Sequence, residues 1–205
     1  MENTDLSKII IRSLKAEEID DFIAIEFSAF HEIVLSIYSN DEESAVYIRK
    51  SEIKLNLSNS TYFVAENEGK IIGTIEIFTK EALKNFKRNF SIYNEKLGYL
   101  KSIKAYFFSS ISPYKMGDDT LYLDTVAVRS SFRRKGIARR LIQFAEDCAR
   151  RYNKKYLSLW VAKDNKPAVG LYRNLGFDTI IKKFFILGNM MFKHSRWIYM
   201  KKEII

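Results

Sequence analysis

Residues that bind metals or form disulfides are nearly missing from this chain of 205 residues. Cys148 is its single cysteine, and there are two histidines. One thiol cannot close an internal disulfide, and these three side chains do not show the spacing of a metal-ligand set. The composition therefore predicts a metal-free protein of a reducing compartment, the cytoplasm. We expect Cys148 to pack in the core rather than to act as a nucleophile.

Glycine and proline are also scarce, with 8 and 2 residues, which excludes collagen-like and low-complexity chains. Hydrophobic side chains make up 47% of the sequence and include 15 Phe and 12 Tyr, enough for the core of one ordinary domain over residues 1–205. The longest stretch without a charge, residues 55–65, is half polar, whereas a membrane span needs ~18 apolar residues. Glu2, Asp5 and Lys8 interrupt the start of the chain, where a signal peptide would be apolar. The sequence thus predicts neither export nor a membrane partner.

Positive charge is concentrated in one segment. The formal net charge is +9, and residues 129–155 contain ten basic side chains against two acidic ones. Residues 1–60 have the opposite balance, with 12 acidic and 6 basic side chains. A basic cluster of this density points to a polyanionic partner, either a nucleic-acid backbone or a phosphorylated cofactor.

Hydrophobic spacing predicts strands and helices in alternation. Strands are predicted over residues 8–14, 61–65, 70–78, 121–128, 156–161, 177–187 and 196–202. Helices are predicted over residues 16–30, 41–57, 138–152 and 167–174, the second of them capped by Asp41.

Residues 79–119 are predicted to form one or two amphipathic helices, broken near Gly98, because apolar side chains recur there at intervals of three and four. We expect this apolar stripe to pack against the body or against a second copy of the chain, which would make a homodimer. Its members are Leu83, Phe86, Phe90, Leu97 and Phe107.

The segment from the strand at 121–128 to the next helix carries the clearest functional pattern. The basic turn Arg133-Arg-Lys-Gly-Ile-Ala138 leads into the helix start, where free backbone N–H groups and the helix dipole favour an anion. Gly136 and Ala138 allow close approach of a phosphate, and Arg133 and Arg134 can donate charge-assisted hydrogen bonds. The turn has neither the GK[ST] ending nor the three spaced glycines of nucleotide-binding loops. Taken alone, it is equally consistent with an ordinary basic turn.

The order of motifs over residues 121–177 resembles the GNAT superfamily of acetyl-CoA-dependent N-acetyltransferases, and the resemblance is weaker over the first 78 residues. Its motifs in chain order are Val126-Ala-Val128, Arg133-x-x-Gly-x-Ala138, an amphipathic helix, Leu159-Trp-Val161, Asn165, Ala168, Leu171-Tyr172 and Leu175-Gly-Phe177. The resemblance implies an α/β (α+β) fold. Its central mixed, mostly antiparallel sheet would have about seven strands, a splayed pair and flanking helices, with residues 79–119 as a helical insertion.

The resemblance also implies site residues. The backbone of Val126, Ala127 and Val128 would pair with the pantetheine arm of acetyl-CoA, the co-substrate. The turn and helix start would bind its pyrophosphate through Arg133, Arg134, Lys135, Gly136, Ile137, Ala138 and Arg139. Asn165 would contact the cofactor near the pantetheine, and Tyr172 would lie beside the sulfur as the general acid.

Transfer of an acetyl group to an amine also needs a base, because an alkylammonium with a pKa near ~10.4 is protonated at neutral pH. Asp124 is the first candidate, and Glu76, Glu32 or a water chain are alternatives. The acceptor, a primary amine of a small molecule or of a protein, stays open.

Two other classes of function are consistent with the charge pattern: a basic nucleic-acid- or ribosome-associated module, and a domain that binds acyl-CoA without turnover. The complete phosphate turn, with Asn165 and Tyr172 downstream, favours the enzyme over both. We therefore expect no specific nucleic-acid partner.

Overall fold

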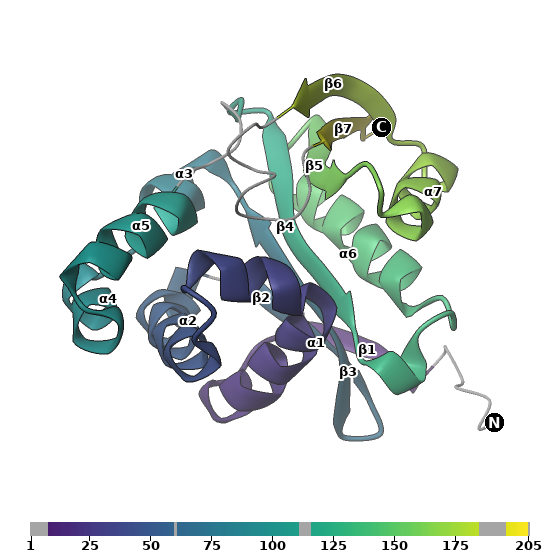
Figure 1. The fold of residues 1–205 in the computed structure, drawn as a ribbon. Helices are drawn as coiled ribbons and strands as arrows, with labels where there is room; N and C mark the ends of the chain where they lie inside the picture. Colours follow the sequence, from purple (N-terminus) through teal and green to yellow (C-terminus); the bar gives the residue numbers. More distant parts are fainter. Residues whose placement is uncertain (1–7, 60, 111–115, 185–195, 205) are drawn as a thin grey trace.

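A seven-stranded sheet forms the centre of the computed structural model, which describes residues 8–59, 61–110, 116–184 and 196–204 (Figure 1). Among the described strands, β4 and β5 pair in parallel and all other neighbours are antiparallel. The predicted mixed, mostly antiparallel sheet is confirmed, although residues 185–187 of the strand predicted over 177–187 lie outside the described residues. In spatial order the strands are β1 (Ile10–Ser13), β2 (Tyr62–Asn67), β3 (Lys70–Phe78), β4 (Thr120–Val128), β5 (Tyr156–Ala162), β7 (Arg196–Glu203) and β6 (Asp178–Phe184).

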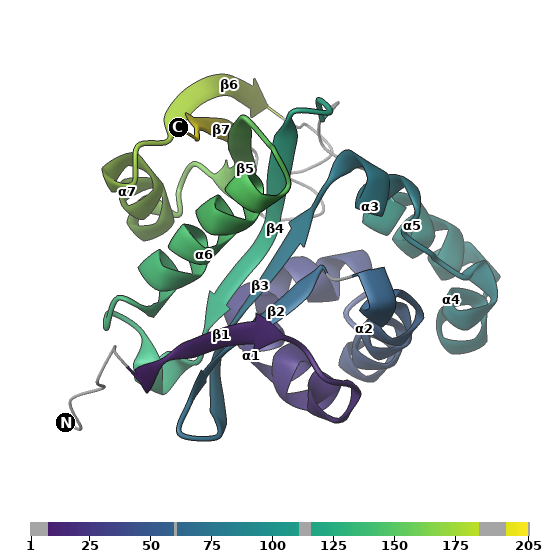
Figure 2. The same ribbon diagram turned by 180° about the vertical axis from the view of Figure 1, so that it is seen from behind.

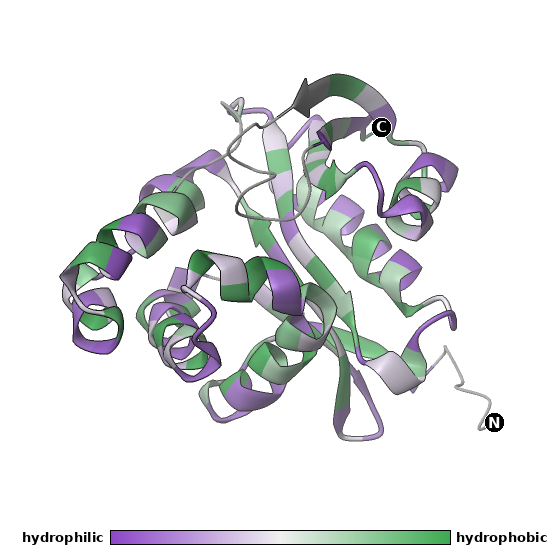
Figure 3. Cartoon of the chain, viewed as in Figure 1, coloured by the Kyte–Doolittle hydropathy of each residue, from purple (hydrophilic) through white to green (hydrophobic). Residues whose placement is uncertain are grey.

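Helices cover both faces of the sheet (Figures 1 and 2). One face is covered by α1 (Ile19–Ile37) and α2 (Glu42–Asn56), and beside them lie α3 (Lys80–Lys84), α4 (Phe90–Leu97) and α5 (Tyr99–Ser110). The other face is covered by α6 (Ile137–Arg151), with α7 (Lys166–Asn174) next to it. Hydrophobic residues are concentrated where the helices face the sheet (Figure 3).

The sheet separates two hydrophobic cores. Between the sheet and α6, Leu141 and Ala145 pack with strand residues such as Ile75, and Cys148 is buried in the same core, as predicted. On the other face, Phe22 of α1 and Tyr93 of α4 belong to a second core. Burial of both apolar helix faces is what keeps the sheet fixed between them.

The first helix differs from the prediction. A short 3₁₀ turn occupies Ala16–Glu18, and α1 then continues to Ile37 instead of ending at Phe30. Phe30 has non-helical backbone angles (φ −125°, ψ 19°), so it marks a kink and not an end. The helix ends at Ile37, and Ser39 and Asn40, which both adopt positive φ, turn the chain away from it. In α2 the predicted cap is confirmed, because the Asp41 side chain accepts a hydrogen bond from the Ser44 N–H.

The described part of the insertion is mostly helical but contains three helices, α3, α4 and α5, instead of one or two, and residues 111–115 of the predicted range lie outside the described residues. Gly98 (φ +72°) separates α4 from α5, as predicted. Its packing was predicted only in part. Leu97 is buried and Phe86 packs against the second core, but Phe107 is 60% exposed and does not pack against the body. The other exposed apolar side chains of α5 are Tyr99, Leu100 and Ile103.

No single helix in the described part of the chain is long and apolar enough to cross a membrane. The segments Ala16–Ile37 and Glu42–Asn59 meet that length and composition only when counted together, and they are bent by 105° to each other. Both contribute buried side chains to the second core.

Candidate active site

A wedge opens between β4 and β5, as the resemblance implied. The two strands pair only from Thr120 to Leu123 against Tyr156 to Leu159. Beyond that point β4 continues beside β3, and β5 continues beside β7. The second half of β4, from Asp124 to Val128, therefore presents a strand edge that β5 does not use. Such an edge is suited to pairing with an extended polar arm.

The loop after β4 leads into an uncapped helix start. Gly136 is the N-cap of α6 in the left-handed region (φ 82°), and no side chain of the described residues caps it. The first backbone bond of the helix runs from the Arg140 N–H to the Gly136 carbonyl, so the three N–H groups before Arg140 have no acceptor within the helix. These groups belong to Ile137, Ala138 and Arg139.

Arg133 makes contacts within the protein that were not predicted. Its Nε donates to the Val128 carbonyl at 3.0 Å, and its Nη2 donates to the Ser28 carbonyl at 3.3 Å. The side chain thus braces the loop against β4 and against α1 near the kink. Arg134 and Arg139 are exposed, and Arg134 adopts a positive φ of 63°. The phosphate contact of Arg133 stays a prediction.

The motif around α7 fixes the position of Tyr172. Asn165 caps the helix, and its Oδ1 accepts a hydrogen bond from the Ala168 N–H. At the other end Gly176 takes a positive φ of 86°, which lets the Phe177 N–H reach the Tyr172 carbonyl at 3.0 Å. Among the described residues the Tyr172 hydroxyl has no hydrogen-bond partner. Burial raises the pKa of this phenol to about 12.

Asp124 lies at the point where the wedge opens, and it is also the extra residue of a β-bulge. Glu76 of β3 pairs with Thr125, but the next residue, Ile77, pairs with Leu123, so Asp124 has no partner on β3. A bulge changes the direction of the side chain that it carries. Solvent reaches Asp124, yet the surrounding protein desolvates the carboxylate and raises its pKa to about 6.

The alternative bases lie in different surroundings. Glu76 is 1% exposed, and desolvation by burial raises its pKa to about 8. Its carboxylate accepts a hydrogen bond from Arg49 Nη2 at 2.6 Å. Glu32 is exposed on α1 and is not among the charges that act most strongly on Asp124 or Glu76.

Tyr122 connects the predicted acid and base. It is the second residue before Asp124 on β4, and burial raises the pKa of its phenol well above the usual range. The charges of Asp124, Tyr199 and Tyr172 also act on it, so all three lie within electrostatic reach of one phenol.

Sequence reasoning missed Tyr122 and a buried charged cluster around Arg49. Arg49 on α2 pairs with Glu26 on α1 through two hydrogen bonds of 3.0 Å each. A signal was present, because Glu26 and Glu52 fall at apolar-face positions of the predicted helices. A charged residue at such a position is buried only when it is paired.

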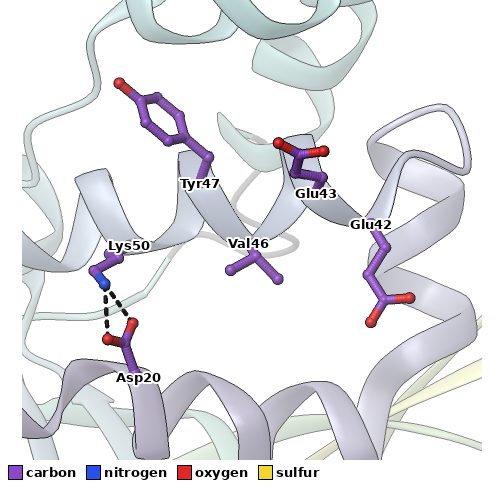
Figure 4. A pocket seen from close by; sticks show the side chains of 6 residues that line it. All are labelled: Asp20, Glu42, Glu43, Val46, Tyr47 and Lys50. Atoms are coloured by element: carbon purple, nitrogen blue, oxygen red, sulfur yellow. Dashed lines mark hydrogen bonds and ion pairs between the residues drawn. The ribbon is translucent and has the colours of Figure 1, made fainter.

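A surface hollow of about 540 Å³ lies elsewhere, between α1 and α2 (Figure 4). The Lys50 Nζ of α2 pairs with the Asp20 carboxylate of α1 at 2.5 Å across the hollow, and Val46 lies to one side of this pair. This hollow contains none of the wedge residues, so we do not assign the chemistry to it. Its lining consists of Asp20, Glu42, Glu43, Val46, Tyr47 and Lys50.

The wedge fits acetyl-CoA. The uncapped first turn of α6 offers N–H groups to a diphosphate, the open edge of β4 offers backbone groups to an amide-containing arm, and a Cβ at Gly136 would be strained at its φ of 82°. In the described ranges there is no group of three His, Cys, Asp or Glu side chains arranged to hold a metal ion.

Comparisons with known proteins agree with this geometry. A sequence model described as acetyltransferase (GNAT) family matches residues 27–177, more than half of the chain. An uncharacterized N-acetyltransferase of Lactobacillus delbrueckii subsp. lactis is 24% identical over 90% of this chain and 92% of its own length. The chloroplastic GCN5-related N-acetyltransferase 4 of Arabidopsis thaliana is 44% identical over 29% of this chain, which spans only 20% of that protein.

A solved structure shows the same fold. The protein yncA of Salmonella typhimurium, solved with its cofactor acetyl-CoA, aligns with a TM-score of 0.60 and 15% identity over 97% of this chain and 95% of its own. The wedge between β4 and β5 and the start of α6 therefore occur in a sheet order and a fold that are already known from a solved structure. The chain belongs to the GNAT family of acetyltransferases.

Proposed function

We propose that this chain transfers the acetyl group of acetyl-CoA to a primary amine of a small molecule or of a protein. The observation that carries the proposal is the position of Asp124. It is the first residue of β4 beyond the pairing with β5, so it lies where the open strand edge begins. The edge leads from there to the uncapped start of α6. Carboxylate, arm-binding edge and phosphate-binding turn therefore follow one another along a single strand and loop.

Acetyl-CoA, when bound, supplies the thioester carbonyl that the amine attacks. The first-turn N–H groups of α6 would hold its phosphates, with Arg134, Lys135 and Arg139 adding positive charge. The edge from Val126 to Val128 would pair with its pantetheine arm, and Asn165 lies at the start of the helix that carries Tyr172.

The Asp124 carboxylate would accept a proton from the substrate ammonium, which leaves the nitrogen lone pair free to attack. A pKa of about 6 suits this role, because the carboxylate is ionised at neutral pH yet is more basic than an ordinary aspartate. Tyr172 keeps its proton at neutral pH and would donate a hydrogen bond to the departing sulfur.

The acceptor side carries negative charge. Glu26 and Glu52 are among the charges that act on Asp124, whereas Glu76, whose pKa is raised to about 8, is largely protonated at neutral pH. This charge would attract a cationic ammonium group. The negative charge does not indicate the size or the chemical class of the amine, so we propose screening small amines and peptide N-termini together.

Asp124→Asn tests the base. We expect kcat/KM to fall ~10²- to 10⁴-fold with acetyl-CoA affinity nearly unchanged, because the amide cannot accept the proton. In the unsubstituted protein the rate should rise with pH through about 6, as the carboxylate ionises. Release of free CoA thiol with a panel of amines, followed from pH 5 to 9, measures both.

Asp178→Asn is the matched control, because Asp178 is an exposed aspartate at the start of β6. Its activity should equal that of the unsubstituted protein. Full activity of Asp124→Asn would reject Asp124 as the base, and Glu76→Gln and Glu32→Gln would then separate the remaining carboxylates from a water chain.

A further inference from the structure

We propose that Arg49 is a positioning residue that keeps Asp124 in its ionised, proton-accepting form through a buried cluster of carboxylates on the acceptor side of the sheet. The inference rests on the proposed function, since it concerns the base of that reaction. Arg49 lies on α2, outside the motifs that define the wedge.

Arg49 connects its own helix, α2, to α1 and to β3. Its Nε and Nη2 donate to the two carboxylate oxygens of Glu26 on α1, each at 3.0 Å, and Nη2 also donates to Glu76 on β3 at 2.6 Å. The side chains of Arg49, Glu26 and Glu76 are 14%, 7% and 1% exposed. A bidentate pair at this burial is fixed in geometry and weakly screened by solvent.

Glu76 connects this cluster to the β-bulge at Asp124. It is the last β3 residue in register before the shift, and its partner Thr125 directly follows Asp124. Both carboxylates therefore lie at the same step of the β3–β4 ladder. The charge of Asp124 raises the pKa of Glu76, while the charge of Arg49 lowers the pKa of both carboxyls.

Other charged and titratable groups also face the cluster. Glu52 on α2 approaches Arg49 at 3.9 Å and Arg88, from the loop before α4, at 3.6 Å. The Tyr93 hydroxyl of α4 donates to Glu52. Four carboxyl groups, Glu26, Glu52, Glu76 and Asp124, therefore share two guanidinium groups, and Glu76 is largely protonated at neutral pH because burial raises its pKa to about 8.

Two phenols complete the surroundings. The guanidinium of Arg49 lies 5.8 Å from the centre of the Tyr62 ring on β2, and Tyr122 flanks Asp124 on β4. Burial raises the pKa of both phenols, so they are neutral at physiological pH and do not balance the carboxylates.

Within this cluster, Arg49 and Glu26 have opposite effects on the pKa of Asp124. The positive charge of Arg49 favours the Asp124 carboxylate, and the negative charge of Glu26 disfavours it. A merely structural ion pair would behave differently, because loss of either partner would then lower stability without moving the titration of Asp124 in opposite directions.

Arg49→Met and Glu26→Gln test the inference. The acid limb of the pH profile of kcat/KM should move to higher pH in Arg49→Met and to lower pH in Glu26→Gln, each by roughly one pH unit. Arg49→Lys keeps the charge and should leave the limb near its original position. Lys50→Met is the matched control, since Lys50 follows Arg49 on α2 and pairs with exposed Asp20.

The pKa of Asp124 should be measured as well, by carbon-13 NMR of aspartate carboxyl groups in the free protein, with Asp124→Asn identifying the signal. Opposite shifts in Arg49→Met and Glu26→Gln support the inference. An Asp124 titration and an acid limb that do not move in folded Glu26→Gln, and in Arg49→Met where that variant folds, overturn it. Glu26→Gln keeps the test decisive if Arg49→Met does not fold.

The two proposals fail in different ways. If the NMR titration of Asp124 shifts as expected but the pH profile does not, Arg49 controls Asp124 as inferred, and Asp124 is not the base of the proposed reaction. If the protein acetylates amines and the titration does not shift, the proposed function stands and the role of Arg49 is rejected.

Discussion

At the scale of single residues, Asp124 shows how position changes a common side chain. An aspartate on a strand is ordinarily solvated and has a pKa near ~3.9. Here a bulge removes its partner on β3 and the splay removes its partner on β5, while desolvation of the carboxylate by the surrounding protein and the charges of neighbouring carboxylates raise its pKa to about 6. Bulges next to active sites redirect side chains in this way.

Tyr172→Phe tests the proposed general acid. The centres of the Tyr172 and Phe177 rings lie 5.7 Å apart, and the substituted ring would keep this contact, so only the hydroxyl is lost. Since the hydrogen bond to the sulfur strengthens in the transition state, we expect turnover to fall ~10- to 1000-fold and acetyl-CoA affinity to change by less than about threefold. Melting temperature, affinity and turnover should be measured on one preparation. Unchanged turnover would reject the acid role.

At the scale of elements, the start of α6 and the insertion differ in how much of their structure could be predicted from the sequence. The helix start after the basic turn was predicted, and its phosphate contact stays a prediction, whereas α5 was predicted as a helix whose apolar stripe packs against the body or against a second copy. Leu100 is 82% and Phe107 60% exposed, because the chain turns at Gly98 and only the Ala105 side of α5 faces the body. The homodimer expected from this stripe stays a prediction.

Gly136→Glu tests the phosphate-binding turn. The substitution forces a side chain into the left-handed region and places a carboxylate where an anion should bind. Calorimetry should show that acetyl-CoA binds at least ~10-fold more weakly, since the introduced carboxylate repels the phosphates that the free N–H groups of the turn would bind. Gly98→Glu is the control, because Gly98 also has a positive φ and open space around it. Equal losses of affinity in both variants would mean that backbone strain, and not the turn, is responsible.

At the scale of the whole molecule, the buried carboxylates predict an unusual dependence of stability on pH. A proton that Glu76 holds more tightly in the fold than in the unfolded chain stabilises the fold below the ordinary pKa of 4.5. This stabilisation is lost as the pH rises through the folded value of about 8. Glu18 and Asp41 have lowered pKa values, so their contribution is lost as the pH falls below their ordinary range.

Thermal stability should therefore be highest near pH 5 to 6 and fall by several degrees towards pH 8, given roughly 2–4 °C per kcal/mol for a chain of this size. Glu76→Gln should flatten that fall, because the amide does not ionise. Calorimetry of both proteins from pH 4 to 8.5 measures the effect. A melting temperature that rises steadily from pH 6 to 8 would contradict the proposed protonation of Glu76.

The sequence by itself determined the family, the sheet with its splayed pair, the helical insertion and the basic turn that leads into α6. These depend on local order: hydrophobic period, capping residues and a fixed succession of motifs between residues 121 and 177. Tertiary structure alone decided the bracing role of Arg133, the kink of α1 at Phe30, the bulge at Asp124 and the cluster around Arg49. The physical reason is that each of these depends on the pairing or packing of segments far apart in the chain, and a charge acquires its pKa only when the fold has chosen its neighbours.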